Sequence, residues 1–311
     1  MFHHFHNKAH PKVQGSISQE EFEDILNFVG IGRILNSFDW LEKLGEGRLS
    51  KEDVCITLDD SLLCQFEIAL PVLEKFNLTA FWFVYSSVFE GTLEKMEIYR
   101  FFRTTFFQSI DDFYGIFFKR IFNAEVAKKA QEVLEEGQIK KLIEQFPFYS
   151  ANDAKFRLIR DCALGKEKYE RIMDEMILEC GVSISDLSKR LWMCNDHLGY
   201  LSGHGHVVGL HSYSHPMVFT NLSYQEQFEQ YQKNYIHIKT VCQCTPVAMS
   251  HPVNSYDEDT LKILKNLGIC CGFRANMLAK LEGGRLNPTN LEIAREDNAN
   301  IVRMLRKGHE S

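Results

Sequence analysis

Short apolar runs alternate with amphipathic stretches along much of this chain. Residues 79–85 (TAFWFVY) combine β-branched and aromatic side chains without a charge, as expected of a strand that is buried on both faces. Residues 55–58 and 207–210 are shorter apolar runs that also predict buried strands. Between the runs, apolar residues recur at helical spacing, as in residues 22–29. Strands that alternate with helices favour a parallel α/β sheet.

The pattern changes between residues 87 and 190. Helical patterns dominate there, for example over residues 127–134 and 166–178, and phenylalanine is frequent. We therefore expect a catalytic α/β domain made of residues 1–86 and 191–311, with residues 87–190 as a helical insertion. An insertion between two strands that carry chemistry is expected to form a lid or cap over the site. The alternative is a subdomain or an oligomer interface with no part in the chemistry.

Two of the predicted strands end in side chains that suit a metal ion. One run ends in Asp59 and Asp60, and a later run ends in His211, which His215 follows four residues on. Adjacent side chains on a strand point to opposite faces, so one carboxylate can bind a metal while its neighbour reaches water or substrate. Asp-Asp pairs also form turns, and single histidines also fill cores. Together, however, one carboxylate and two imidazoles form the ligand set of an open, catalytic metal site.

Both segments resemble motifs of the polysaccharide deacetylase family, whose domain is also called the NodB-homology or carbohydrate esterase family 4 domain. Residues 57–61 (TLDDS) are similar to the T-F-D-D-G motif, from which they differ at Leu58 and Ser61. Residues 211–215 (HSYSH) agree with the H-[ST]-x-x-H motif. The resemblance implies a deformed (β/α) barrel that acts as a metal-dependent hydrolase.

The resemblance also implies roles for individual residues. Asp60, His211 and His215 would bind one divalent metal ion, with zinc expected first and cobalt or another transition metal as alternatives. Asp59 would act as the general base toward the attacking water. The reaction implied is removal of an N-acyl group, acetyl or formyl, from an amino sugar. Its implied setting is bacterial surface-glycan biosynthesis.

The family's third motif, R-P-P-[YF]-G, aligns with residues 250–254 (SHPVN), which depart from it. In the family, the arginine of this motif steadies the base. Here Ser250 stands in its place, and Arg295 is a candidate for the missing guanidinium. The family's aromatic residue is Val253, whose backbone amide can still stabilise an oxyanion.

The general acid has no clear counterpart because the family's late L-x-H motif is not visible. His251 is our candidate, with a structural histidine that holds the loop as the alternative. Asp297 is a further candidate, equally able to form an ion pair with Arg295. Near the N-terminus, either residues 2–3 or residues 5–6, both Phe-His, are the expected counterpart of a Tyr-His pair in the family's first strand. The histidines of this segment are candidates for substrate contacts.

Composition limits the partners. The 311 residues carry a net charge of -7 without a basic patch, which argues against nucleic acid and anionic membranes as partners. No apolar stretch approaches the length of a membrane span, and the N-terminus lacks the apolar region of a secretion signal. The nine cysteines are scattered without C-x-x-C spacing, which favours reduced thiols over disulfides or a zinc knuckle. We therefore expect a cytoplasmic protein, whose oligomeric state the sequence does not indicate.

Three functions remain open on the sequence. The first is an N-deacylase whose partner is a glycan or a small molecule bearing an N-acyl amino sugar. The altered third motif and the insertion favour a soluble or nucleotide-linked sugar over a polymer. The second is a metal-dependent amidase on a non-sugar amide, which the same site could serve. The third is a catalytically silent carbohydrate-binding protein that kept the metal and lost the support of the base and the acid.

Overall fold

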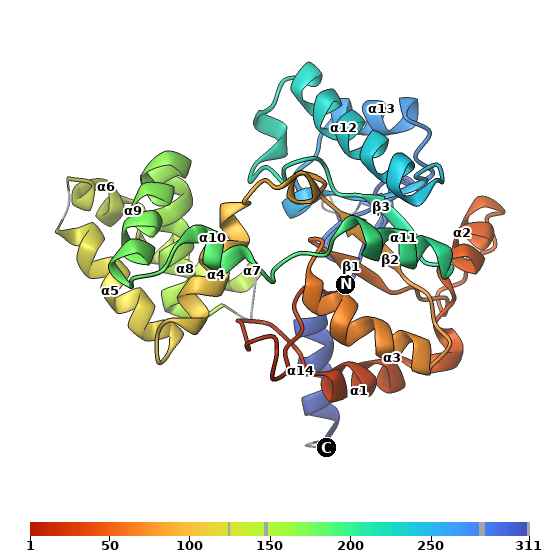
Figure 1. Ribbon diagram of the computed structural model, residues 1–311, viewed down its shortest axis with the longest axis horizontal. Coiled ribbons are helices and arrows are strands. Elements are labelled where there is room, and N and C mark those ends of the chain that lie inside the picture. The colour runs from red at the N-terminus through yellow and green to blue at the C-terminus, as the bar shows by residue number, and fades with distance from the viewer. Residues whose placement is uncertain (124, 146–148, 280–283, 310–311) are drawn as a thin grey trace. The chain divides into compact units, whose positions relative to one another are not determined.

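The computed structural model describes residues 1–123, 125–145, 149–279 and 284–309. The chain forms two compact units (Figure 1). The first, here called the sheet unit, consists of Met1–Pro11, Gly15–Glu94 and Leu191–Ser311. The second, the helical unit, consists of Lys12–Gln14 and Lys95–Arg190. The main segment of the helical unit thus begins at Lys95 rather than at residue 87, because the short helical turn Ser87–Glu90 belongs to the sheet unit.

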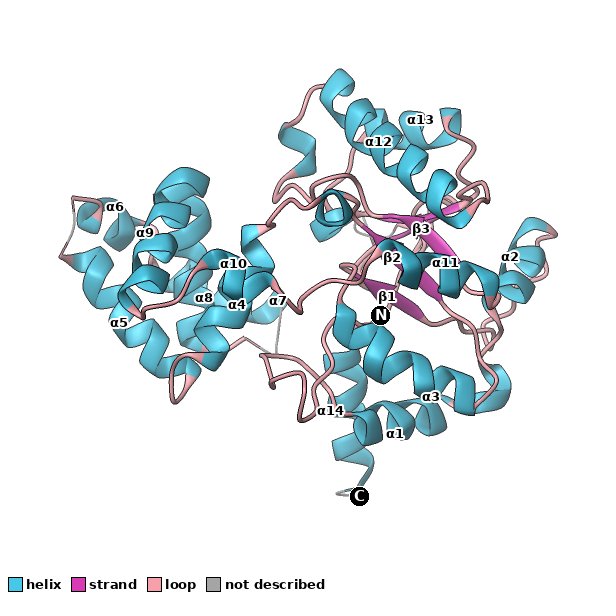
Figure 2. Ribbon diagram, in the orientation of Figure 1, coloured by secondary structure: helices cyan, strands magenta, loops and turns pink. Residues whose placement is uncertain are grey.

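The sheet unit is built on five parallel strands that follow one another in sequence order (Figure 2). They are β1 (Thr57–Asp59), β2 (Phe81–Val84), β3 (Val207–Leu210), β4 (Ala248–Ser250) and β5 (Cys271–Phe273). The register pairs Leu58 with Trp82 and Phe83 with Gly209. A Cβ on Gly209 would lie 2.6 Å from the carbonyl oxygen of Ala248, so only glycine permits this approach of β3 to β4. Every residue of the five strands is buried, as the apolar runs predict.

The sheet curls so that its two edges approach each other. Beside β1, Phe2 forms a parallel bridge with Leu58, and beside β5, Ile293 forms one with the last residue of that strand. The chain after Ile293 returns to the first edge, where the Asn298 amide donates to the carbonyl oxygen of Met1 at 3.1 Å. The result is a curled half-barrel, which confirms the deformed (β/α) barrel that the motifs imply.

Helices pack around this sheet and bury their apolar faces. They are α1 (Gln19–Val29), α2 (Ser37–Gly45), α3 (Leu70–Lys75), α11 (Asn195–Gly203), α12 (Tyr224–Cys242), α13 (Glu258–Asn266) and α14 (Asn298–His309). At the start of α1, the Ser18 hydroxyl accepts from the Glu21 amide at 3.2 Å, and the Glu21 carboxylate accepts from the Ser18 amide at 2.8 Å. This capping box satisfies two amides that the first turn of a helix leaves unpaired. Among the described residues, no helix combines the length and the apolar character that a bilayer span requires.

The helical unit is organised around aromatic rings. Its helices are α4 (Lys95–Thr105), α5 (Ile110–Phe122), α6 (Ala127–Glu132), α7 (Glu136–Gln145), α8 (Ala151–Leu158), α9 (Gly165–Glu179) and α10 (Ile184–Ser188). A wide helical turn, Ile159–Leu164, joins α8 to α9. The buried rings of Phe117 and Phe156 meet edge to face at 5.1 Å between centroids. Four phenylalanines of this segment are therefore core residues, namely Phe102, Phe113, Phe117 and Phe156, whereas Phe106 and Phe122 are exposed.

Candidate active site

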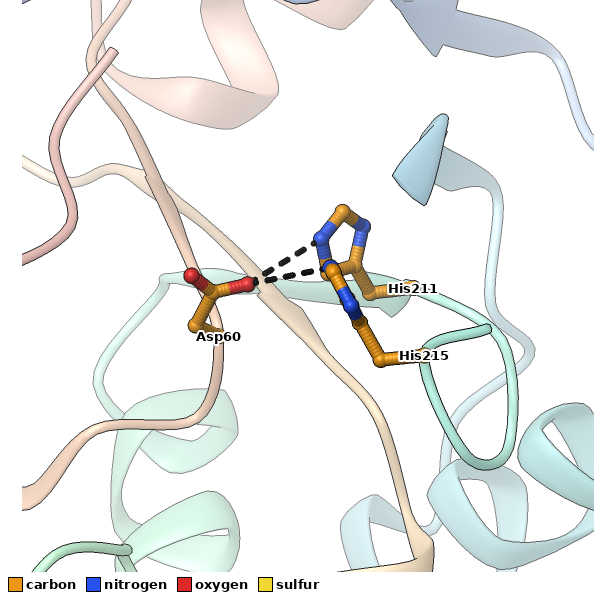
Figure 3. A group of neighbouring side chains, drawn as sticks. All are labelled: Asp60, His211 and His215. Atoms are coloured by element: carbon orange, nitrogen blue, oxygen red, sulfur yellow. Dashed lines mark ion pairs between the residues drawn. The ribbon is translucent and has the colours of Figure 1, made fainter. Parts of the chain in front are cut away.

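The ends of β1 and β3 carry the three predicted metal ligands. Asp60 directly follows β1, with a φ of 81° in the left-handed region. His211 directly follows β3, and the loop after it brings His215 to the same place, so that both rings face Asp60 (Figure 3). Asp60 Oδ1 lies 3.3 Å from Nε2 of His211 and 3.4 Å from Nε2 of His215. The structure thus brings together residues that lie about 150 positions apart in the chain.

These three side chains fit a tetrahedral divalent cation. Metal–ligand distances of about 2.0–2.2 Å place neighbouring ligand atoms roughly 3.3–3.6 Å apart, close to the separations around Asp60. Nδ1 of His211 donates to the carbonyl oxygen of Ser250 at 2.8 Å, which leaves the lone pair of Nε2 directed at Asp60. Burial by itself would raise the pKa of Asp60, but the imidazoles of His211, His3 and His215 hold it well below its usual range. The donor set is typical of zinc and also accommodates cobalt.

Asp59, the predicted base, is held by a buried guanidinium. Its two carboxylate oxygens accept from Arg295, at 2.8 Å from Nη1 and 2.7 Å from Nη2. The Ser250 hydroxyl donates to the same carboxylate at 2.9 Å. Burial alone would raise the pKa of Asp59, but the positive charge of Arg295, with contributions from His211 and His3, lowers it. Asp59 is therefore an ionised carboxylate with a fixed orientation.

Arg295 supplies the guanidinium that Ser250 lacks, because it contacts the Asp59 carboxylate. The residue is 5% exposed. Besides the Asp59 carboxylate, it donates to the Ser250 hydroxyl at 2.7 Å, to the Thr57 hydroxyl at 3.1 Å and to the carbonyl oxygen of Arg274 at 2.6 Å. All three guanidinium nitrogens are thus engaged. Since Arg295 follows the segment beside β5 whereas Asp59 ends β1, this contact depends on the curl of the sheet.

The Asp297 carboxylate has other contacts than those predicted. The suggested ion pair between Arg295 and Asp297 is wrong, because the guanidinium is directed to Asp59 instead. One carboxylate oxygen of Asp297 accepts from the Ala299 amide at 2.8 Å, at the beginning of α14. This contact makes Asp297 a helix-capping residue and does not support a role as general acid.

The contacts of His251 favour the structural alternative over the predicted acid. Its ring is fully buried and stacks on the ring of Tyr256, with 4.0 Å between centroids. Nε2 lies 2.7 Å from the carbonyl oxygen of Leu291, to which it donates. Burial lowers the pKa of His251 to about 4, so the ring is neutral and its one N–H is already used. A neutral imidazole in this state has no proton to give to a leaving group.

Val253 has a strained backbone. Its φ of 46° is in the left-handed region, which is unfavourable for a β-branched residue. Its side chain is 45% exposed, so packing does not explain the strain. Val253 lies in the short helical turn Pro252–Asn254 that follows β4, and its amide is the group to which the resemblance gives the oxyanion contact.

His3, in the N-terminal segment, lies at the site. The bridge between Phe2 and β1 places His3 beside Asp59, and Nε2 of His3 lies 4.0 Å from Asp59 Oδ2. The His3 side chain is 29% exposed, so solvent or substrate can reach it. The ring of His6, by contrast, contacts the hydroxyl of Ser16 at 3.0 Å. Residues 2–3 were one of two expected pairs, and only the pairing of Phe2 with the sheet distinguishes them.

These features define an α/β half-barrel with a triad that could hold a cation and an arginine-held carboxylate at the strand ends. Residues 187–272 match the family model described as polysaccharide deacetylase. The matched segment contains His211 and His215. No curated protein matches the sequence.

Three solved structures share the fold over most of their length. PplD, a deacetylase of Streptococcus pyogenes in complex with acetate, is 13% identical with a TM-score of 0.54, over 98% of this chain and 94% of that one. IcaB from Ammonifex degensii is 14% identical with a TM-score of 0.53, over 94% and 88%. A de-N-acetylase from Aggregatibacter actinomycetemcomitans is 10% identical with a TM-score of 0.52, over 95% and 92%. The chain is thus similar to the polysaccharide deacetylase family over residues 187–272 and shares the fold of these three structures.

Proposed function

We propose that this protein is a metal-dependent hydrolase that removes an N-acyl group, acetyl or formyl, from an amino sugar in a glycan or a sugar metabolite. One observation carries the proposal. The Asp59 carboxylate, fixed by Arg295, lies next in sequence to Asp60, which faces His211 and His215. A triad that fits a cation beside an oriented carboxylate is a combination that can hydrolyse an unactivated amide, because the metal activates water and polarises the carbonyl while the carboxylate takes the proton.

The metal ion, when bound to Asp60, His211 and His215, supplies a Lewis acid for the acyl carbonyl and lowers the pKa of water. Asp59 takes a proton from the water that attacks the carbonyl carbon. Its bidentate contact with Arg295 keeps the carboxylate ionised and fixes its orientation.

Two further groups complete the reaction. The amide of Val253 donates to the oxyanion that forms on the carbonyl oxygen. His3 gives a proton to the nitrogen of the amino sugar as the carbon–nitrogen bond breaks, because it is the exposed imidazole next to Asp59. The products are a carboxylic acid and a free amine.

The test is acetate or formate release from a panel of N-acetyl and N-formyl amino sugars, including nucleotide-linked sugars and oligosaccharides, with zinc or cobalt added. We expect turnover by the wild type and its loss in Asp59→Asn with metal content unchanged. If the wild type is no more active than Asp59→Asn on every substrate, the protein is a silent binder. If only non-sugar amides are hydrolysed, it is an amidase of another class.

A further inference from the structure

The helical unit contains a cluster of four arginines that the proposed reaction does not use. They come as two pairs with the spacing R-x-x-R: Arg100 and Arg103 on α4, and Arg157 and Arg160 at the end of α8 and in the turn that follows it. Residues three apart on a helix lie on one face, so each pair presents two guanidiniums together. The two pairs approach each other around one ring. The guanidiniums of Arg103 and Arg160 lie 5.0 and 5.9 Å from the centre of Phe156.

Two of these arginines have carboxylate partners. Arg100 pairs with Glu97 at 3.2 Å, and Arg160 pairs with Asp161 at 2.5 Å. Asp153, another nearby carboxylate, accepts from the hydroxyl of Tyr114 and from Gln14 at 2.7 Å. The carboxylates around the cluster are therefore largely used by other groups.

Among the described residues, Arg103 and Arg157 have no carboxylate partner, although the Arg157 guanidinium lies 4.2 Å from the centre of the Tyr149 ring. Arg103 is only 4% exposed, yet within the described residues its guanidinium forms no hydrogen bond and no ion pair with a carboxylate. The Nε of Arg157 is likewise buried, and it has no hydrogen-bond acceptor among the described residues. Burial lowers the pKa of Arg103 to about 10, and the charges of Arg157 and Arg100 add to this effect.

A buried charge without a partner is costly, and stacking on a ring offsets only part of that cost. The contact of an arginine with an aromatic ring is weaker than the loss of hydration that burial of an uncompensated ion entails. The cluster is not closed off, since the side chains of Arg100 and Arg160 are 24% and 12% exposed. An anion from solvent can therefore reach the guanidiniums through the exposed members.

We propose that Arg103 and Arg157, with Arg100 and Arg160 around them, bind a phosphate group in the helical unit. A tetrahedral dianion offers several oxygens that two guanidinium forks from different helices can share. The phosphate is either free inorganic phosphate or the phosphate of an ester such as a nucleoside diphosphate. The site is independent of the proposed hydrolysis, because none of its residues belongs to the sheet unit.

The experiment uses the full chain, freed of metal by dialysis so that phosphate cannot bind through a bound ion. Thermal unfolding is followed in sodium phosphate and in sodium chloride of equal ionic strength, and binding is measured by titration calorimetry. With about 10 mM phosphate and millimolar affinity, we expect a rise in Tm of roughly 3–5 °C over chloride. Titration with a nucleoside diphosphate distinguishes the two sources, since an ester ligand should bind at least about tenfold more tightly than phosphate.

Three variants decide the outcome. Arg103→Met and Arg157→Met should each abolish the phosphate-dependent rise in Tm. Arg120→Met, which removes an arginine that pairs with Glu179 on the surface of the same unit, should retain it. If Arg103→Met fails to fold, Arg157→Met gives the same test, because Arg157 is only half-buried. A wild type without any phosphate response, or a response that survives in both cluster variants, would overturn the proposal.

Discussion

Arg295 and Arg103 are equally buried, but they differ in the hydrogen bonds that their guanidiniums form. Arg295 in the sheet unit is 5% exposed and uses every nitrogen, in contacts with Asp59, Ser250, Thr57 and a backbone carbonyl. Arg103 in the helical unit is 4% exposed, and its guanidinium makes no such contact with the described residues. A fully paired guanidinium fixes its neighbours, whereas an unpaired one is available to a ligand. The comparison therefore separates an arginine that positions Asp59, the proposed base, from one that we propose receives an anion.

The largest effect is expected on kcat when Asp59, the carboxylate that pairs with Arg295, is replaced. Asp59→Asn keeps the shape of the side chain but removes the base and its charge. We expect kcat for deacylation to fall about 10³–10⁴-fold, with metal binding retained. Steady-state kinetics together with metal analysis checks this. A variant that keeps a tenth of the wild-type kcat would show that Asp59 is not the base.

The second effect is on stability and compares the two arginines directly. Arg295→Met leaves the Asp59 carboxylate buried without its partner, and we expect the free energy of unfolding to fall by about 3–5 kcal/mol. Arg103→Met removes a charge that has no carboxylate partner among the described residues, so the free energy of unfolding should stay the same or rise. Urea denaturation of both variants in phosphate-free buffer measures the difference. Equal losses in the two variants would break the comparison.

A third effect concerns His206, a buried group that is satisfied only in its neutral form. Its Nδ1 accepts from the Ala80 amide at 3.0 Å and from Nε1 of Trp82 at 3.1 Å. Burial lowers the pKa of His206 to about 4, whereas an unfolded histidine titrates near 6.5. Between these values the unfolded state binds the extra proton, so the stabilising effect is complete above pH ~6.5 and is lost as the pH falls toward ~4.

This loss should amount to roughly 3 kcal/mol at its full extent. His206→Asn keeps an acceptor oxygen and removes the titration. The free energy of unfolding of the wild type, measured by urea denaturation from pH 7.5 downward, should therefore fall more steeply than that of His206→Asn. Parallel curves for the two proteins would mean that His206 does not titrate as described.

The smallest effect is expected at His3, the most exposed member of the site's polar groups. We expect His3→Gln to lower kcat for an N-acetyl sugar about a hundredfold, because the amine then leaves without a proton donor. An activated aryl ester, whose leaving group needs no proton, should be hydrolysed at nearly the wild-type rate. Equal losses on amide and ester would assign His3 a role in positioning rather than in proton transfer.

The sequence predicted the parts of the site that depend on local pattern. Apolar runs marked the strands, and the polar residues at their ends marked Asp59, Asp60, His211 and His215. The parallel topology follows from the alternation of strands and helices. These features need only the periodicity of a strand and the register of a short motif.

The remaining features depend on how the sheet closes, which no local pattern encodes. The contact between Arg295 and Asp59 spans 236 positions and exists because the two edges of the half-barrel meet. His3 reaches the site because Phe2 pairs with β1, and nothing in the sequence distinguishes this pair from residues 5–6. The contacts of His251 do not support the predicted role of general acid, because its N–H donates to the carbonyl oxygen of Leu291. In each case the partner lies on an element distant in sequence.

The most direct test of the central claim is metal binding by the purified protein. Titration calorimetry with Zn²⁺, with elemental analysis of the isolated complex, should give one equivalent for the wild type and a negligible amount for the double variant His211→Ala, His215→Ala. Each single variant should bind at least about tenfold more weakly. Zinc bound equally by the wild type and the double variant would show that Asp60, His211 and His215 do not share an ion, and the account of the reaction would fail.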